Sequence, residues 1–187
     1  MRQAQVLSDR DVARVLTAIA KRSYGHRDRA MFMLSLLAGM RVGEIAALRV
    51  SDAYEADGTV RDHIRLAGHQ TKGSEARTVL LNQRMQDELG LYARTLTRKG
   101  DQQLFVSKWG KRMSPNSMVQ VFGRFYRAAG LANASSHSGR RSFLTGLAHK
   151  GVNVRVLASL AGHKNISTTQ RYIEVGEHQL RAAVELV

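Results

Sequence analysis

Hydrophobic positions in the first quarter of the chain repeat with helical spacing. Those after Ser8 fall on one helical face: Val12, Val15, Leu16 and Ile19. Ser8 also has an acidic residue three positions later, an arrangement close to a capping box, so the pattern predicts a helix over about residues 8–22. A second helix is predicted from about His26, and it is apolar on nearly all sides, as is typical of a buried central helix. Gly39 ends it, and a short helix is predicted over residues 41–48.

Residues 50–82 follow a different pattern. Short runs of alternating hydrophobic and polar residues at 60–66 and 76–81 are separated by loops that contain glycine, which predicts a small antiparallel sheet. Helical patterns then resume at about 83–98, 115–129, 138–150, 153–161, 168–174 and 177–186. The fold class predicted is therefore α+β, mainly α-helical with a small antiparallel β-sheet near residues 50–82.

The composition favours a polyanionic partner. The chain has 187 residues, which suits one domain, and its 29 Lys and Arg against 15 Asp and Glu give a net charge of +14 spread along the sequence. Nucleic acid phosphates bind such a surface through counterion release. The absence of cysteine excludes a disulfide framework, a thiolate nucleophile and a Cys-based zinc site. We find no signal peptide and no apolar run long enough to span a membrane, so we expect a soluble, cytoplasmic protein.

Several separate segments carry cationic side chains suited to binding one anion. His137 and Arg140 lie three positions apart at a predicted helix start, so they share a face. A guanidinium can grip two phosphate oxygens, and an imidazole can donate a hydrogen bond or act as a base. Arg41 follows the break at Gly39, and Lys72 lies in the loop between the two predicted strands.

The stretch GHKNISTTQRYI, residues 162–173, holds one tyrosine among small polar and cationic residues. Its residues 167–170 resemble a capping box, which predicts a helix from about Thr168 with Tyr172 on the second turn. A glycine ends the preceding helix, so His163 is expected in a turn whose backbone can approach a ligand closely. Taken by itself, Tyr172 is better explained as an interfacial aromatic residue whose hydroxyl is hydrogen-bonded than as a nucleophile.

Taken in order, these segments resemble the catalytic domain of the tyrosine recombinases, the phage integrase family. The resemblance rests on AGMRVGEIAAL, TKGSEARTVLL, HSGRR and AGHKNISTTQRYI, and it runs from about residue 5 to residue 180. Each site residue has a structural explanation by itself, such as a helix cap for Arg41, a phosphate-backbone contact for Arg140, a solvated turn for Lys72 or a structural donor for His163. Their joint occurrence in the family's order is what favours a catalytic site.

The resemblance implies a phosphoryl-transfer chemistry. Tyr172 would attack a DNA phosphodiester and leave a 3′-phosphotyrosyl link and a free 5′-hydroxyl. A phenol with a pKa of about 10 is a weak nucleophile at neutral pH and needs assistance. Arg41 and Arg140 would clamp the non-bridging oxygens and stabilise the charge of a phosphorane-like transition state. His163 would hydrogen-bond the same phosphate.

The remaining roles are also implied by the resemblance. His137 would accept the proton of Tyr172 or donate to the phosphate, and Lys72 would protonate the leaving 5′ oxygen. Glu44 resembles the family's acidic residue that supports the first arginine. No metal or other cofactor is expected. Other lysines are less suitable as the general acid because they follow a predicted helix or a later hairpin: Lys99, Lys108 and Lys111.

Three positions depart from the family's pattern. Gly139 stands where a bulky aliphatic residue is common in the family, so a packing contact would be lost. A glycine in a helix also costs about 1 kcal/mol of helix propensity relative to alanine. Both effects would place Arg140 less accurately. Arg141 stands where a histidine is frequent, and we interpret it as a backbone contact or a surface charge. Glu174 replaces another frequent histidine two residues after the tyrosine, so a subunit contact there would differ.

The prediction is a site-specific DNA recombinase formed by a single catalytic domain over residues 1–187, without the family's N-terminal core-binding domain. The alternatives are a catalytically silent DNA-binding protein on the same scaffold and a nicking-closing enzyme of the type IB topoisomerase kind. Expected partners are double-stranded DNA, further copies of the chain in a tetramer on paired sites, and accessory DNA-bending proteins, with the protein associated with the nucleoid. The predicted helix at 177–186 would pack in cis or on a neighbouring subunit.

Overall fold

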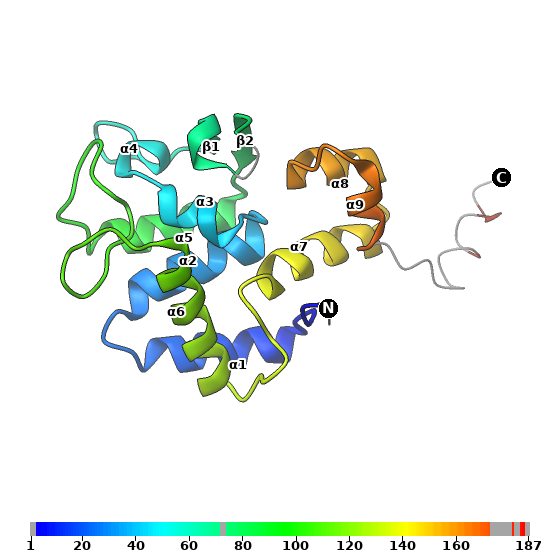
Figure 1. The fold of residues 1–187 in the computed structure, drawn as a ribbon, viewed down its shortest axis with the longest axis horizontal. Coiled ribbons are helices and arrows are strands. Elements are labelled where there is room, and N and C mark those ends of the chain that lie inside the picture. Colours follow the sequence, from blue (N-terminus) through cyan, green and yellow to red (C-terminus); the bar gives the residue numbers. More distant parts are fainter. Residues whose placement is uncertain (1–2, 72–73, 173–180, 182–183, 186–187) are drawn as a thin grey trace. The chain divides into compact units, whose positions relative to one another are not determined.

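The computed structural model describes residues 3–71 and 74–172, together with residues 181, 184 and 185. The chain divides into two compact units, Met1–Phe143 and Leu144–Val187. Both are built mainly from helices (Figure 1). The elements along the chain are α1 (Asp9–Ala20), α2 (Gly25–Leu37), α3 (Val42–Ala47), α4 (Val50–Ala53), β1 (His63–Leu66), the 3-10 helix η1 (Gly68–Gln70), β2 (Arg77–Leu80), α5 (Gln83–Ala93), α6 (Pro115–Ala128), α7 (Ser138–His149), α8 (Val154–Ala161) and α9 (Ile166–Gln170).

Helix α1 begins with the capping box that the sequence predicts. The Asp11 backbone N–H donates to the Ser8 hydroxyl at 3.2 Å, and the Ser8 backbone N–H donates to the Asp11 carboxylate at 3.1 Å. Two of the backbone donors left over at the helix start are thus satisfied, an effect of about 1 kcal/mol. Val15 and Ile19 on the predicted apolar face are buried, so the predicted helix is confirmed.

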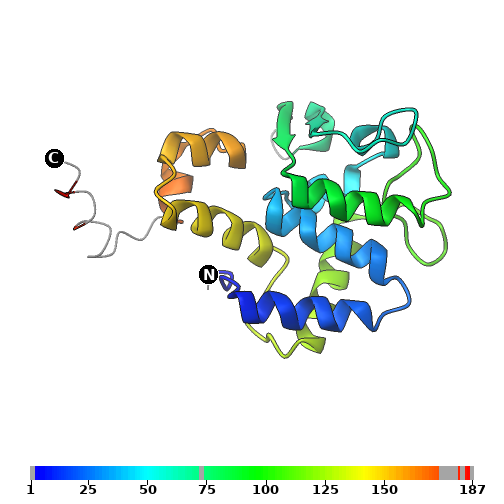
Figure 2. The ribbon, with the colours of Figure 1, turned by 180° about the vertical axis from the view of Figure 1, so that it is seen from behind.

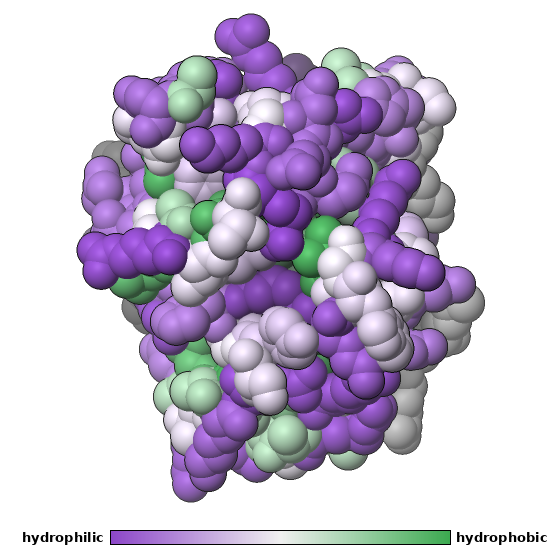
Figure 3. Space-filling model, turned by 90° about the vertical axis from the view of Figure 1, so that its left-hand side faces the viewer, coloured by the Kyte–Doolittle hydropathy of each residue, from purple (hydrophilic) through white to green (hydrophobic). Residues whose placement is uncertain are grey.

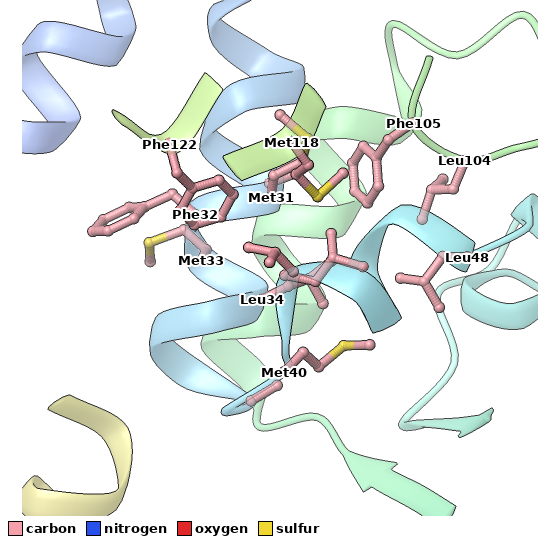
Figure 4. Close-up of a cluster of buried hydrophobic side chains, with 14 of the residues drawn as sticks. Met31, Phe32, Met33, Leu34, Met40, Leu48, Leu104, Phe105, Met118 and Phe122 are labelled. Atoms are coloured by element: carbon pink, nitrogen blue, oxygen red, sulfur yellow. The ribbon is translucent and has the colours of Figure 1, made fainter. Parts of the chain in front are cut away.

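Helix α2 is the central element of the first unit. Its residues 30–35 are all buried, as its nearly uniform apolar pattern predicts. It packs against α1, α3 and α5, and Figures 1 and 2 show α5 alongside α2 from both sides. In Figure 4 the side chains of Met31 and Phe32 lie among residues of α6 and of the segment that follows α5, including Met118, Phe122 and Phe105.

The sheet is smaller than the region predicted for it. Strands β1 and β2 pair antiparallel, with His63 opposite Leu80 and Leu66 opposite Arg77. The start of the region instead forms helix α4, where the Asp52 carboxylate accepts a hydrogen bond from the Arg49 backbone N–H at 2.8 Å. The strands lie within the predicted runs 60–66 and 76–81, and a helix of four residues such as α4 is too short to show a helical repeat in the sequence.

Helices α5 to α8 begin within one residue of their predicted starts, and some end earlier. Ser114 caps α6 by accepting from the Ser117 backbone N–H at 3.1 Å, with Pro115 in the first helical position. Helix α5 ends at Ala93, five residues before its predicted end. In the second unit, α8 ends at Gly162, whose φ of 60° is left-handed. The predicted helix at 177–186 lies almost entirely outside the described residues.

Polar residues dominate the face of the molecule shown in Figure 3, with hydrophobic residues in small separate patches. Within the part of the chain that the structure describes, no helix combines the length and hydrophobicity needed to cross a bilayer.

Candidate active site

The turn between α2 and α3 carries the first predicted cation, Arg41. Gly39 in this turn has a left-handed φ of 61°, and a Cβ atom there would lie 2.5 Å from Cδ1 of Phe143 on α7. Glycine is therefore required for both the backbone conformation and the close approach of α7. Arg41 follows as the N-terminal cap residue of α3 and is partly exposed.

Glu44 holds Arg41 in place. The Arg41 guanidinium donates from Nη1 to Oε1 of Glu44 at 2.8 Å, and the Arg41 backbone N–H donates to Oε2 at 2.8 Å. Glu44 itself is only 1% exposed. The acidic residue that the sequence places near the first arginine thus contacts both the side chain and the backbone of that arginine.

A second arginine, Arg77, binds the same carboxylate and was not identified from the sequence. Its Nη2 donates to Oε2 of Glu44 at 2.7 Å and its Nε donates to Oε1 at 3.1 Å, a two-point contact. Arg77 begins β2 and shares the inward face of that strand with the buried Val79. A charged residue in an inward position of a short amphipathic strand needs a buried partner, and this signal could have identified it.

The two arginines keep Glu44 ionised. Burial, the largest single effect, would raise the pKa of the Glu44 carboxyl, but the hydrogen bonds and charges of Arg77 and Arg41 together outweigh it, so the pKa lies below its ordinary value. The group therefore carries its negative charge throughout the neutral range. Stability from this ionisation is present above the ordinary carboxyl pKa and is lost as the pH falls through the lowered value.

Arg140 reaches the same turn from α7. Its Nη1 donates to the Gly39 carbonyl oxygen at 2.5 Å, and the residue is 4% exposed. The turn that carries Arg41 is thus also where the Arg140 guanidinium lies. The first unit gathers three guanidiniums and one carboxylate at this position, from Arg41, Arg77, Arg140 and Glu44, which leaves two positive charges in excess.

Gly139 contributes to the placement of Arg140, contrary to what the sequence suggested. A Cβ at Gly139 would lie 2.7 Å from Oγ of Ser35 and 3.3 Å from the backbone N of Leu36, both on α2. The missing side chain therefore lets the first turn of α7 pack directly against α2. The expected loss of packing is corrected: at this position a bulky aliphatic residue would push the two helices apart.

Replacing Gly139 by alanine is expected to lower the free energy of unfolding by about 1–3 kcal/mol, because the added methyl group overpacks the contact with Ser35. Gly146 on the same helix is the matched control, since a Cβ there meets nothing within 4 Å and alanine should stabilise the helix by about 1 kcal/mol. Urea denaturation of both variants measures the difference. Equal stabilisation by the two substitutions would contradict the close packing at Gly139.

Of the two remaining predicted cations, the structure describes His137 but not Lys72. His137 precedes α7 and is exposed, with its backbone N–H donating to the Ser135 hydroxyl at 3.3 Å. Lys72 lies outside the described residues, between Thr71 and Ser74.

The second unit holds His163 and Tyr172. Their rings are stacked, with centroids 6.0 Å apart and planes 20° apart. Nδ1 of His163 lies 2.9 Å from the hydroxyl of Thr169, which is fully buried. Thr169 was not identified from the sequence, and this contact fixes how the imidazole is turned.

The helix before the tyrosine differs from its prediction. Helix α9 begins at Ile166, where the Asn165 side chain accepts from the Ser167 backbone N–H at 3.0 Å, and it ends at Gln170. Tyr172 therefore lies in the turn that follows the helix and not on its second turn. Asn165 and Ser167 are both good cap residues, and the earlier one is used.

Comparison with known proteins decides the family. A model described as the phage integrase family matches residues 5–179. The chain belongs to this family. Tyrosine recombinase XerA of Pyrococcus furiosus is 30% identical over 184 residues, which cover 96% of the chain and 60% of the relative. Tyrosine recombinase XerD of Staphylococcus epidermidis is 31% identical over 179 residues, 92% of the chain and 58% of the relative. The chain thus spans about three fifths of these relatives' lengths.

Solved structures share the fold. A crystal structure of XerA recombinase superposes with a TM-score of 0.78 at 23% identity, covering 100% of this chain and 66% of that one. The Tn1549 transposon integrase in complex with circular intermediate DNA gives 0.76 at 20% identity, covering 99% and 67%. The predicted fold class, the tyrosine recombinase catalytic-domain fold, is confirmed.

Proposed function

We propose that the chain is a site-specific DNA recombinase that cleaves and rejoins DNA through a 3′-phosphotyrosyl intermediate. The observation that carries the proposal is the pair of guanidiniums at one turn, Arg41 held by the buried Glu44 and Arg140 bound to the Gly39 carbonyl. Family membership and recombinase relatives at about 30% identity support it.

In this mechanism the scissile phosphate binds at the turn between α2 and α3. Arg41 and Arg140 each donate to non-bridging oxygens and stabilise the negative charge that grows as the phosphorus becomes five-coordinate. Because Glu44 fixes Arg41 before DNA arrives, little ordering is left for the transition state, which favours catalysis by preorganisation. The three arginines and one glutamate at this turn carry two net positive charges, which balance the two negative charges of the five-coordinate phosphorus species.

Tyr172 acts as the nucleophile and His163 as a phosphate donor. The Tyr172 oxygen attacks phosphorus and forms an O–P bond. The phosphate stays attached to the 3′ oxygen of the cut strand, while its bond to the 5′ oxygen breaks. His163 has its Nδ1 against Thr169, so the ring is oriented for Nε2 to serve the phosphate. His137 takes the tyrosine proton or donates to the phosphate, and Lys72 protonates the departing 5′ oxygen. Attack by the 5′-hydroxyl of another strand reverses these steps and rejoins the DNA.

Charge distribution supports double-stranded DNA as the substrate. Residues 102–173 contain 11 Lys and Arg and no Asp or Glu. Such a run favours contact with the phosphate backbone, and binding should weaken steeply as salt concentration rises. Structural neighbours such as XerH are described in complex with their DNA sites. By the same proposal residues 1–187 form a single catalytic domain. Copies of the chain assemble as a tetramer on paired sites, associated with the nucleoid and with accessory DNA-bending proteins.

The function is tested with a DNA site selected by the protein itself. Wild-type protein is incubated with a pool of nicked duplexes containing a randomised segment, and the duplexes that become covalently attached are sequenced. Two copies of the selected site are then placed on a supercoiled plasmid. We expect deletion or inversion between the copies. Relaxation without exchange would indicate the nicking-closing alternative, and salt-dependent binding without any covalent attachment would indicate the DNA-binding alternative.

A further inference from the structure

Arg77 occupies an unusual place for an arginine in a DNA-binding protein. Its side chain is 10% exposed and makes its two-point contact with the buried Glu44, so its charge is neutralised inside the protein instead of facing DNA. The same carboxylate also accepts hydrogen bonds from the side chain and the backbone N–H of Arg41, at the start of α3. Glu44 is therefore a bridge that joins the start of β2 to the start of α3.

Removing Arg77 would change the ionisation of the Glu44 carboxylate more than it would change the structure of strand β2. A buried carboxylate that loses one of two cations becomes harder to keep ionised, and it then holds its remaining partner less firmly. That partner is Arg41, which the proposed function places on the phosphate. The strand itself keeps its antiparallel register and the buried Val79.

The base of the hairpin between β1 and β2 is also fixed. The Thr71 hydroxyl lies 2.7 Å from the Glu75 carbonyl oxygen and 3.0 Å from that of Gly68, so both sides of the loop are tied together. A Cβ on Gly68 would lie 2.5 Å from the Ser74 carbonyl oxygen, which shows how closely the two sides approach. Arg77, the first residue of β2, lies two positions after Glu75 at this base.

We propose that Arg77 is a positioning residue that orients Arg41 through Glu44 and ties the start of β2 to the Arg41 turn. This role rests on the proposed recombinase function. Arg77 does not contact the phosphate in this scheme. Its effect is to hold the first phosphate-binding arginine in one fixed orientation.

The test replaces Arg77 by methionine, which keeps the length and apolar stem and removes the charge. At saturating nicked duplex we expect single-turnover cleavage to fall roughly 10- to 100-fold, the range that loss of an orienting partner costs at metal sites. The DNA dissociation constant should stay within about threefold, because one of many cations is lost and it is a buried one. Arg77→Lys, which keeps the charge without the two-point geometry, should recover part of the rate.

The pH profile separates positioning from general destabilisation. In Arg77→Met, the buried Glu44 carboxylate keeps only Arg41 as a cationic partner, so the pKa of Glu44 rises. The acid limb of the cleavage rate should then move to higher pH. Among the described residues, the charged groups that act on the Glu44 carboxylate are Arg77 and Arg41. The matched control is Arg65→Met, an exposed arginine on the paired strand β1, which should leave the rate and the profile unchanged.

A double-mutant cycle and a spectroscopic measurement complete the test. If Arg77 acts through Glu44, Arg77→Met should cost little further rate in a Glu44→Gln background. The Nε–Hε signal of Arg41, followed by ¹⁵N relaxation without DNA, should show increased mobility in Arg77→Met and not in Arg65→Met. This signal decides the positioning role even if the wild-type protein forms no covalent adduct, an outcome that would overturn the proposed function alone. Unchanged Arg41 mobility, or losses from Arg77 and Glu44 that add in full, would overturn the proposal.

Discussion

Strand cleavage by the Arg140→Ala variant at saturating DNA is expected to be about 10²- to 10³-fold slower than wild type, the loss typical of one removed transition-state donor. The Arg140 guanidinium is buried against the Gly39 carbonyl oxygen, in the turn between α2 and α3. It therefore contributes little to the exposed basic surface. DNA affinity and its dependence on salt should therefore change little. Single-turnover cleavage of a nicked duplex and a salt titration of binding measure the two effects separately.

Two controls sharpen this result. Arg124→Ala removes an exposed arginine of α6 and should leave the cleavage rate unchanged. Arg140→Lys keeps the charge but cannot make a two-point contact with phosphate, so it should remain far slower than wild type. Thermal melting establishes that each variant is folded. A proportional loss of binding and cleavage in Arg140→Ala would contradict the catalytic role and favour the DNA-binding alternative.

Much of the fold follows from local signals in the sequence. Ser8 and Ser114 each cap the helix they were predicted to start, because a hydroxyl that accepts a backbone hydrogen bond acts within three residues. Gly39 and Gly162 end helices with a left-handed φ, again a local property. Predictions from neighbouring residues were therefore confirmed at these four positions, whereas at α9 two cap residues competed and Asn165, the earlier one, is used.

Contacts between distant segments could not be predicted in the same way. Arg77 lies 33 positions from Glu44, and no local sequence pattern around either residue indicates that the two are in contact. The need for glycine at position 139 comes from Ser35 on α2, which only the packing of α7 reveals. Motif order predicts Arg41 and Arg140 as site residues, whereas the contacts of Arg77 with Glu44 and of Gly139 with Ser35 become visible only in the structure.

The Tyr172→Phe variant is expected to lose covalent DNA attachment completely. The substitution removes only the hydroxyl, while the ring keeps its stacking against His163. Folding and DNA affinity should therefore match wild type, and the loss should be confined to the chemical step. Tyr24→Phe, at an exposed tyrosine beside Arg27, is the matched control and should form the adduct at the wild-type rate.

The central claim is that Tyr172 becomes joined to the 3′ phosphate of a cut strand. The most direct measurement traps the adduct on a nicked suicide duplex, digests the protein and identifies the modified peptide by mass spectrometry. We predict a nucleotide attached through its 3′ phosphate to Tyr172, and no adduct from Tyr172→Phe. An adduct of equal yield from Tyr172→Phe, or one mapped to another residue or to a 5′ phosphate, would contradict the account.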